Sequence, residues 1–176
     1  MIGSVLRLFL GIILTLGVIA APARAQDVAT PEVRLYAGIS MDDLADTLLL
    51  EGLRFKEVPI DGQGMVANRR FDVDDGVQWS VLGYDCENEN GCSELQLRAV
   101  FRAGGPENVV LKLLNDWNKA NRFTRAYLGN EVSAILEMDI YLSGGQSLKN
   151  IREQIIIWRQ SARRFSTTMA GDAGTP

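Results

Sequence analysis

The sequence predicts an α+β domain in which three amphipathic helices cover one face of a mainly antiparallel sheet of five to six strands. Apolar residues recur at helical spacing in three segments, and between these segments apolar and polar residues alternate as they do in strands. Short turns rich in glycine, asparagine and aspartate join the strands, so neighbouring strands should run antiparallel. The expected order is helix, strands, helix, two strands, helix, with the helices segregated to one face of the sheet.

The first 25 residues have the features of a secretory signal peptide. Arg7 gives a short positive start, Leu8 to Ala21 is almost entirely apolar, and Ala23-Arg24-Ala25 is a small-x-small cleavage pattern. The apolar run is shorter than the about 20 residues that a membrane-spanning helix needs. We therefore expect cleavage after Ala25, a periplasmic or secreted location, and no membrane contact after cleavage.

The composition of the mature chain excludes several classes of partner and of catalytic site. Without Arg7 and Arg24 it has 16 basic and 22 acidic residues, a net charge of −6. This balance favours solubility and argues against a nucleic-acid partner. The sequence contains no histidine, which removes histidine-based triads and most transition-metal sites. Gly-x-Ser-x-Gly and glycine-rich phosphate loops are absent as well. We expect no cofactor, no metal and no catalytic residue.

The two cysteines, Cys86 and Cys92, are expected to form a structural disulfide, because an exported chain meets an oxidising compartment. A metal site would need more ligands, and redox-active pairs are usually spaced more closely. The bond would pin the loop of a hairpin and stabilise the fold by at most about 3 kcal/mol.

The domain is expected over residues 38–166, after a linker over residues 26–37. Ser40 should cap the first helix, because Asp43 follows it at capping-box spacing, and Gly52 should end it. The apolar face of this helix is formed by Met41, Leu44, Ala45, Leu48 and Leu49.

Four extended segments are expected next. Residues 53–60 contain Pro59, which lacks a backbone donor and suits an edge strand. Met65–Val73 and Val77–Tyr84 are joined by the hairpin signal Asp74-Asp75-Gly76. Leu95–Phe101 alternates in the way of a strand with one face in water.

The second half of the chain supplies two more helices and two strands. Pro106 is expected at the first position of a helix that ends near Asn121, with Val110, Leu113, Trp117 and Ala120 on its apolar face. Arg125–Leu128 and Val132–Leu142 should pair through a tight turn at Gly129-Asn130. Ser147 should cap a last helix whose apolar face holds Leu148, Ile151, Ile155, Trp158, Ala162 and Phe165. Residues 167–176 are expected to be a disordered tail.

The segment between Asn115 and Leu128 contains the densest set of amide, aromatic and guanidinium groups, so it either fastens a helix to the sheet or faces a partner. Its candidate binding residues are Asn115, Trp117, Asn118, Asn121, Arg122, Arg125 and Tyr127. The three asparagines share one flank of the helix, where amides satisfy backbone groups or could read a peptide backbone. Trp117 falls on the apolar face, which favours core packing over a binding platform.

Charged residues offer two further hypotheses. Arg122 and Arg125 flank Phe123 and could clamp an anion. The favoured interpretation is that they pair with acids such as Glu137 and Asp139 while Phe123 packs inward. Those two acids share one strand face and could support acid–base catalysis, although a solvated outer face is favoured. The last helix carries a basic flank, also expected to be solvated, formed by Arg152, Arg159 and Arg163.

The stretch Trp117–Leu128, followed by a tight turn and Leu136-Glu137-Met138-Asp139, resembles the YbjN family of bacterial sensory transduction regulators. The cysteine pair before Leu95–Ala99 and the Gly144-Gly145 pair before the last helix carry the same resemblance, which covers about residues 36–165. The family fold is similar to type III secretion chaperones, which are dimeric α+β proteins that bind extended polypeptide.

The resemblance implies a binding or regulatory module and not an enzyme. The leading hypothesis is an exported module that binds a protein or peptide, with a homodimer as one expected assembly. The alternative is a sensor of small anions that uses Arg122 and Arg125. A hydrolase using Glu137 and Asp139 ranks last.

Overall fold

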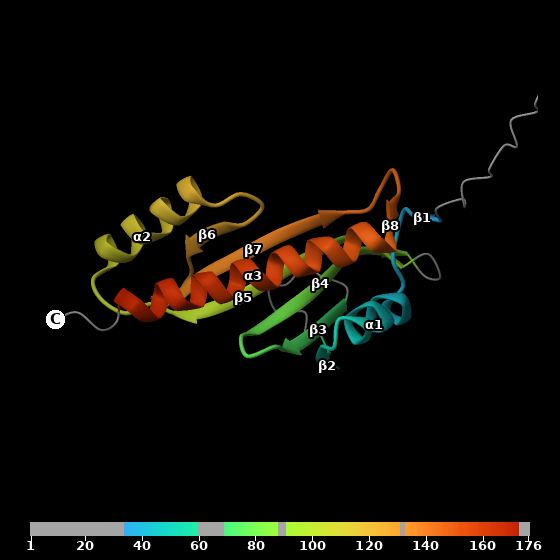
Figure 1. Ribbon diagram of the computed structural model, residues 1–176, viewed down its shortest axis with the longest axis horizontal. Helices are drawn as coiled ribbons and strands as arrows, with labels where there is room; N and C mark the ends of the chain where they lie inside the picture. The colour runs from blue at the N-terminus through green and yellow to red at the C-terminus, as the bar shows by residue number, and fades with distance from the viewer. Residues whose placement is uncertain (1–33, 60–68, 88–90, 131–132, 173–176) are drawn as a thin grey trace, which may run out of the picture. The chain divides into compact units, whose positions relative to one another are not determined.

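Six strands form one antiparallel sheet in the order β2-β3-β4-β5-β7-β6, within the residues that the computed structural model describes, 34–59, 69–87, 91–130 and 133–172 (Figure 1). The predicted fold class is confirmed. The strands are β2 Arg54–Glu57, β3 Arg69–Asp74, β4 Gln78–Glu87, β5 Gly91–Arg102, β6 Arg125–Leu128 and β7 Ser133–Tyr141.

Three helices pack on one face of this sheet. They are α1 Met41–Leu50, α2 Glu107–Ala120 and α3 Leu148–Asp172, and Figure 1 shows α3 running along the sheet between α1 and α2. One apolar cluster joins the helices to the inward side chains of the strands. Its largest fully buried members are Trp158, Phe165, Ile39, Leu44, Leu48, Leu95, Leu97, Leu136, Ile140, Leu142 and Ile151.

Helix α1 begins and ends where the sequence predicts. The Ser40 hydroxyl oxygen accepts a hydrogen bond from the Asp43 backbone N–H at 3.1 Å, and Gly52 has a φ of 69°. Leu49, expected on the apolar face, is exposed. Thr47 is buried instead, and its hydroxyl donates to the Asp43 carbonyl oxygen at 2.7 Å, which satisfies the polar group inside the domain.

Helix α2 differs from the prediction in two details. Pro106 is the extended residue that precedes the helix, and the first helical residue is Glu107. The buried stripe is Val110, Leu114 and Trp117, whereas Leu113 is half-buried and Ala120 is exposed. These three buried residues are spaced by four and then three positions, which places them on one side of α2, facing the core.

The hairpin signals are placed correctly. Asp74 pairs with Gln78 around the β3–β4 turn, and β2 lies at the sheet edge as its proline predicts. Cys86 and Cys92 are direct partners at the ends of β4 and β5, and their sulfur atoms lie 2.03 Å apart. A Cβ atom at position 83 would lie 2.6 Å from the Cys92 sulfur, so Gly83 makes room for this pair. The start of the strand expected from Met65 lies outside the described residues.

Two expectations about the ends of the domain need correction. Within the expected linker, β1 Leu35–Tyr36 pairs antiparallel with β8 Gln146–Ser147. Within the expected tail, α3 continues to Asp172, because Met169 lies four residues after Phe165 and is buried on the same face. The predicted signal peptide lies outside the described residues. None of the helices in the described part of the chain is long and apolar enough to cross a membrane.

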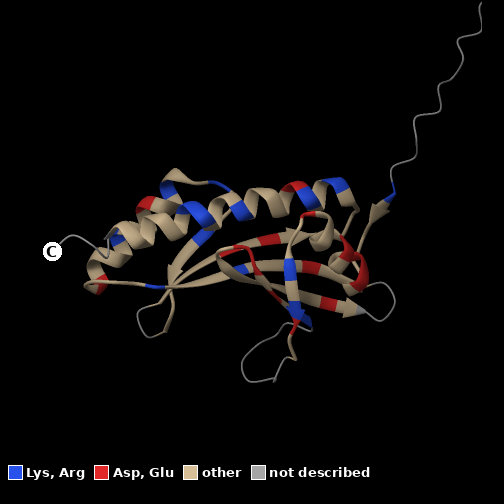
Figure 2. Cartoon of the chain, turned by 60° about the horizontal axis from the view of Figure 1, so that its bottom comes forward, with Lys and Arg blue, Asp and Glu red and all other residues tan. Residues whose placement is uncertain are grey.

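The basic flank of α3 is not a simply solvated face. Arg152 pairs with Glu51 at 2.7 Å, at the end of α1. Arg159 and Arg163 both pair with Asp75 in the β3–β4 turn, at 2.7 and 2.8 Å. Figure 2 shows several basic residues along α3. Arg152, Arg159 and Arg163 fasten α3 to the end of α1 and to the β3–β4 turn, so their charges are already paired within the domain.

Candidate functional site

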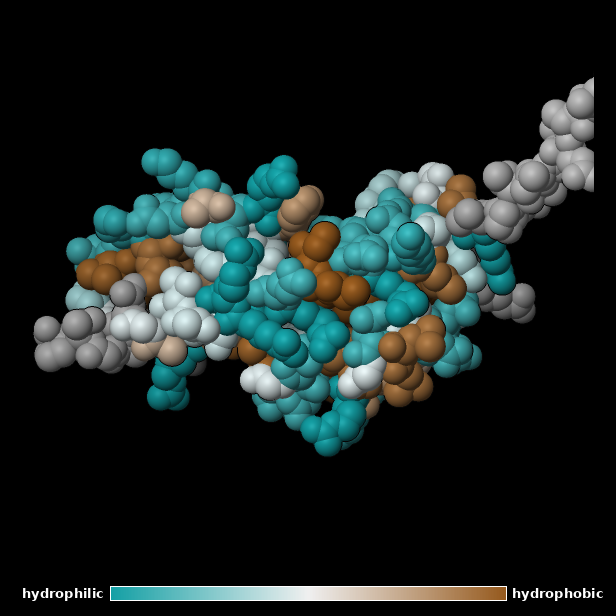
Figure 3. Space-filling model, in the orientation of Figure 1, coloured by the Kyte–Doolittle hydropathy of each residue, from teal (hydrophilic) through white to brown (hydrophobic). Residues whose placement is uncertain are grey.

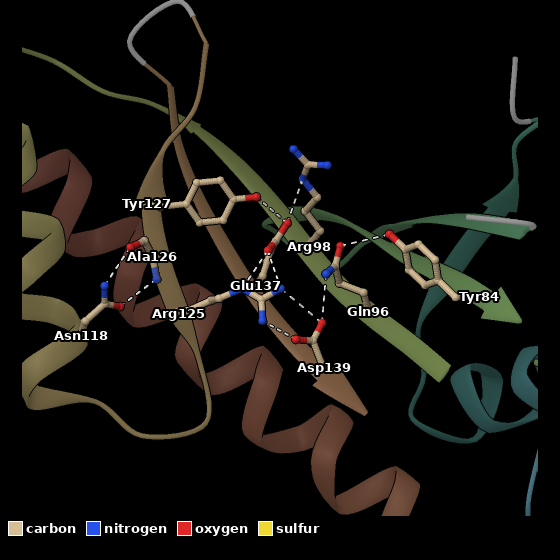
Figure 4. Close-up of polar contacts among 9 residues, drawn as sticks. All are labelled: Tyr84, Gln96, Arg98, Asn118, Arg125, Ala126, Tyr127, Glu137 and Asp139. Atoms are coloured by element: carbon tan, nitrogen blue, oxygen red, sulfur yellow. Dashed lines mark hydrogen bonds and ion pairs between the residues drawn. The ribbon is translucent and has the colours of Figure 1, made fainter. Parts of the chain in front are cut away.

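Asn118 fastens α2 to the outer edge of the sheet. Its side-chain amide donates to the Ala126 carbonyl oxygen at 2.8 Å, and its side-chain oxygen accepts from the Ala126 N–H at 2.7 Å (Figure 4). Both backbone groups belong to β6, the last strand of the sheet. The amide thus occupies the place that a further strand would take at Ala126.

The buried side chain of Trp117 also attaches α2 to its neighbours. The ring is 6% exposed, packs edge-to-face on Phe165 at 4.9 Å, and donates its indole N–H to the Thr124 hydroxyl at 3.2 Å. Asn121 donates its side-chain amide to the Trp117 carbonyl oxygen at 3.0 Å, at the end of α2. Trp117 and Asn118 therefore join the helix layer to the sheet, Asn121 caps the end of α2, and Asn115 is exposed on α2.

A polar network lies on the sheet face opposite the helices. Its centre is Glu137 on β7, whose side chain is 5% exposed. Arg125 contacts this carboxylate at 2.9 Å and also binds Asp139, and the Tyr127 hydroxyl donates to Glu137 at 2.7 Å. Nε of Arg98 lies 3.4 Å from the same carboxylate, an ion pair without hydrogen-bond geometry. Gln96 donates to Asp139 at 2.9 Å, and Tyr84 donates to Gln96 at 3.3 Å.

The predictions about the charged residues Arg125, Glu137 and Asp139 can be compared with this network. Arg125 pairs with Glu137 and Asp139, as the favoured interpretation expects. The expectation that both acids are solvated is wrong for Glu137, because two arginines and a tyrosine surround it. Arg122 has no acidic partner among the described residues, contrary to the same interpretation, and stacks over the Phe123 ring at 5.2 Å. Phe123 is 61% exposed and does not pack inward as predicted.

Sequence reasoning missed Arg98, Gln96 and Tyr84 as members of the network. Strand register brings Arg98 opposite Glu137, and Glu137 opposite Arg125, in one row across β5, β7 and β6. The alternation around Arg98 identifies a polar strand face, but it does not say which strand lies beside it. The non-sequential order β5-β7-β6 supplies that information.

The environment of the network favours neutral tyrosines. Burial raises the pKa of Tyr127 to about 12, and its hydrogen bond to the Glu137 carboxylate acts in the same direction. Burial also raises the pKa of Tyr84, with a further contribution from the charge of Glu137. The pKa of Arg125 is raised mainly by its hydrogen bond to Asp139. These groups hold a fixed arrangement of charges, which is the behaviour of a structural ion-pair network.

A second surface feature is a groove between α2 and the C-terminal half of α3, which we call the α2–α3 groove. It has a volume of about 720 Å³. Figure 3 shows apolar surface over this part of the molecule. The lining residues are Val109, Lys112, Leu113, Asp116, Trp117, Ala120, Asn121, Arg164, Thr167 and Thr168.

The charges in the α2–α3 groove are not balanced. Lys112 and Asp116 pair with each other at 2.6 Å on the surface of α2. The Arg164 guanidinium lies over the Trp117 ring at 5.9 Å and has no acidic partner among the residues that the structure describes. The hydroxyls of Thr167 and Thr168 donate to carbonyl oxygens of α3 itself, so these side chains add little polarity to the groove.

Comparison with known proteins identifies the family. The sequence profile of the YbjN family, described as "Putative bacterial sensory transduction regulator", matches residues 57–170, more than half of the chain. The chain belongs to the YbjN family. The predicted resemblance is confirmed, and the described elements of the match include β3, α2, β6 and most of α3.

A solved structure of the family shows the same fold. The crystal structure of YbjN from E. coli, "a putative transcription regulator", is 16% identical with a TM-score of 0.51, and the match covers 77% of this chain and 91% of that chain. An uncharacterized protein from Methanothermobacter thermautotrophicus is 15% identical with a TM-score of 0.49, over 77% of this chain and 96% of that chain. No curated protein matches the sequence. At this identity, the likeness to YbjN from E. coli concerns the fold.

Proposed function

We propose that this YbjN-family protein is an exported, non-enzymatic module that binds a protein or peptide in the α2–α3 groove. The observation that carries the proposal is the groove itself, with Val109 and Leu113 on one wall and the Trp117 ring beneath the Arg164 guanidinium. A concave, mainly apolar surface with a few polar groups is the usual form of a binding site. Its volume of about 720 Å³ accommodates several side chains of a partner.

Two of the residues first considered for binding, Trp117 and Asn121, line the groove, and others are engaged by contacts within the domain. Trp117 and Asn118 hold the layers together, and Arg125 is engaged by Glu137 and Asp139. An anion clamp at Arg122 and Arg125 would have to break these contacts, and an acid–base pair at Glu137 and Asp139 would have to release Arg125. Binding in the groove would break none of these contacts, and Arg164 has no acidic partner there among the described residues.

Export is part of the proposal and rests on the predicted signal peptide. Sequencing of the N-terminus of the protein recovered from the periplasm or culture medium should give Gln26 as the first residue. A product that retains Met1 and stays with the cytoplasmic fraction would contradict export without affecting the groove.

Site-specific photo-crosslinking tests the binding site. A photoreactive residue at position 109, in the groove, should give a covalent adduct with another protein in intact cells. The same residue at position 50, where the side chain is also exposed but lies at the end of α1, should give none. Adducts at both positions or at neither would contradict the proposed site. An adduct of twice the mass of the protein would identify a second copy of the chain as the occupant instead.

A further inference from the structure

We propose that the partner segment lies in the α2–α3 groove as an amphipathic helix and places an acidic side chain on Arg164. This inference rests on the proposed function and names the conformation and chemistry of the partner. It differs from the extended polypeptide that the likeness to type III secretion chaperones implies.

The backbone of the groove argues for a helical occupant. Both walls are helices, whose backbone N–H and C=O groups are bonded within the helix, so the walls offer an extended peptide no row of backbone partners. The nearest sheet edge is β6, where the side chain of Asn118 already binds both backbone groups of Ala126. A strand in the groove would leave its own polar backbone unpaired at the buried surface, whereas a helix satisfies its backbone internally.

The spacing of the apolar wall fits a helix of about three turns. Val109, Leu113 and Ala120 form one stripe along α2, which spans about 16 Å at the rise of an α-helix. A partner helix of equal length presents apolar side chains at positions i, i+4, i+7 and i+11. Such side chains would cover the apolar wall and the floor formed by Trp117.

The positive charge in the groove determines which charged side chain the partner should carry. Asp116 is paired with Lys112, so the charge that remains for a ligand, among the described residues that line the groove, is that of Arg164. Its guanidinium can donate two parallel hydrogen bonds to a carboxylate while it stays above the Trp117 ring. A glutamate or aspartate at the edge of the apolar face of the partner meets this requirement.

A display library provides the probe. Fourteen-residue peptides with Leu, Ile, Val, Phe or Met at positions i, i+4, i+7 and i+11, and random residues elsewhere, are selected against the mature protein. Selected peptides should carry a carboxylate beside the apolar face, and a central proline should weaken their binding at least tenfold, because it breaks the helix. Arg164→Glu should weaken binding about five- to tenfold, and replacement of the peptide acid by lysine should restore it.

Matched controls separate the possible failures. Arg122→Glu makes the same charge change outside the groove and should leave binding unchanged, and Leu50→Asp is the same kind of control for Val109→Asp. Binding that Val109→Asp abolishes, but that tolerates proline or a basic peptide, would overturn this inference and keep the proposed function. If no peptide is enriched, or if Val109→Asp changes nothing, the groove is not a helix-binding site.

Discussion

Glu137 and Arg125 face each other across β7 and β6, and their charged groups meet at 2.9 Å on the sheet face away from the helices. The contact places a buried carboxylate beneath a half-exposed guanidinium. Arg98 approaches the same carboxylate from the other side. One acid on β7 thus pairs with an arginine on each of its two neighbouring strands, β5 and β6.

Glu137→Gln should lower the free energy of unfolding by about 2–4 kcal/mol at pH 7, because it leaves two arginines without their shared buried partner. Asp139→Asn removes a half-exposed carboxylate from the same strand and should cost less than about 1 kcal/mol. Urea denaturation of both variants measures the difference. Equal losses would show that the burial of Glu137 has no special weight.

Asn118→Ala should destabilise the fold by about 1–3 kcal/mol, since it leaves the N–H and C=O of Ala126 without their partner. The Ala126 amide should also exchange with solvent faster in hydrogen-exchange measurements. Asn115→Ala, at an exposed position three residues earlier on α2, is the matched control and should change neither quantity. Unaltered exchange at Ala126 in Asn118→Ala would refute the role assigned to this side chain.

Tyr127 should make stability depend on alkaline pH. Its pKa is raised from 10.0 to about 12, so the unfolded chain loses the proton first and stability falls as pH rises from about 10 to about 12. Tyr127→Phe should flatten this fall in unfolding experiments across the same range. Tyr141→Phe, on the same sheet face, should retain it. A fall of the same size in Tyr127→Phe would mean that other groups are responsible.

Asp75 should make the stability of the fold depend on pH in the acidic range. Its hydrogen bond from Arg159 is the main reason that its pKa lies below the ordinary value of 3.8. The stabilisation is present above about pH 4 and is lost as the carboxylate is protonated at lower pH. Asp75→Asn should therefore cost about 1–3 kcal/mol at pH 7, with a difference from wild type that shrinks toward pH 2. Asp74→Asn, which removes a more exposed acid, should have little effect at either pH.

The predicted disulfide has its own test. Intact-mass measurement of the exported protein before and after reduction should show a gain of two hydrogens on reduction, at Cys86 and Cys92. Replacing both residues by alanine should lower the free energy of unfolding by at most about 3 kcal/mol, because the closed loop is short. Two free thiols before reduction would reject the bond.

Periodicity and turn chemistry were sufficient to predict the fold. The capping pattern at Ser40, the hairpin residues around Asp75 and the apolar repeat of α3 each depend on neighbours in sequence, and all three are found as predicted. The end of α3 was placed too early because Met169 follows polar residues, and its burial depends on tertiary contacts.

The site was harder to predict because it depends on which distant elements meet. Nothing local to Arg98 indicates that β7 lies beside β5 and brings Glu137 opposite it. In the same way, Val109 on α2 and Arg164 on α3 share a groove only because both helices pack on the same face of the sheet. The residues chosen from local density alone, such as Trp117 and Asn118, fasten the layers together.

The most direct test of the central claim compares two faces of the protein in the same cells. A photoreactive residue replaces either Val109, in the α2–α3 groove, or Tyr127, in the polar network on the opposite face of the sheet. The account predicts a partner adduct from position 109 and none from position 127. An adduct from position 127 alone would contradict it and would place recognition on the charged face of the sheet.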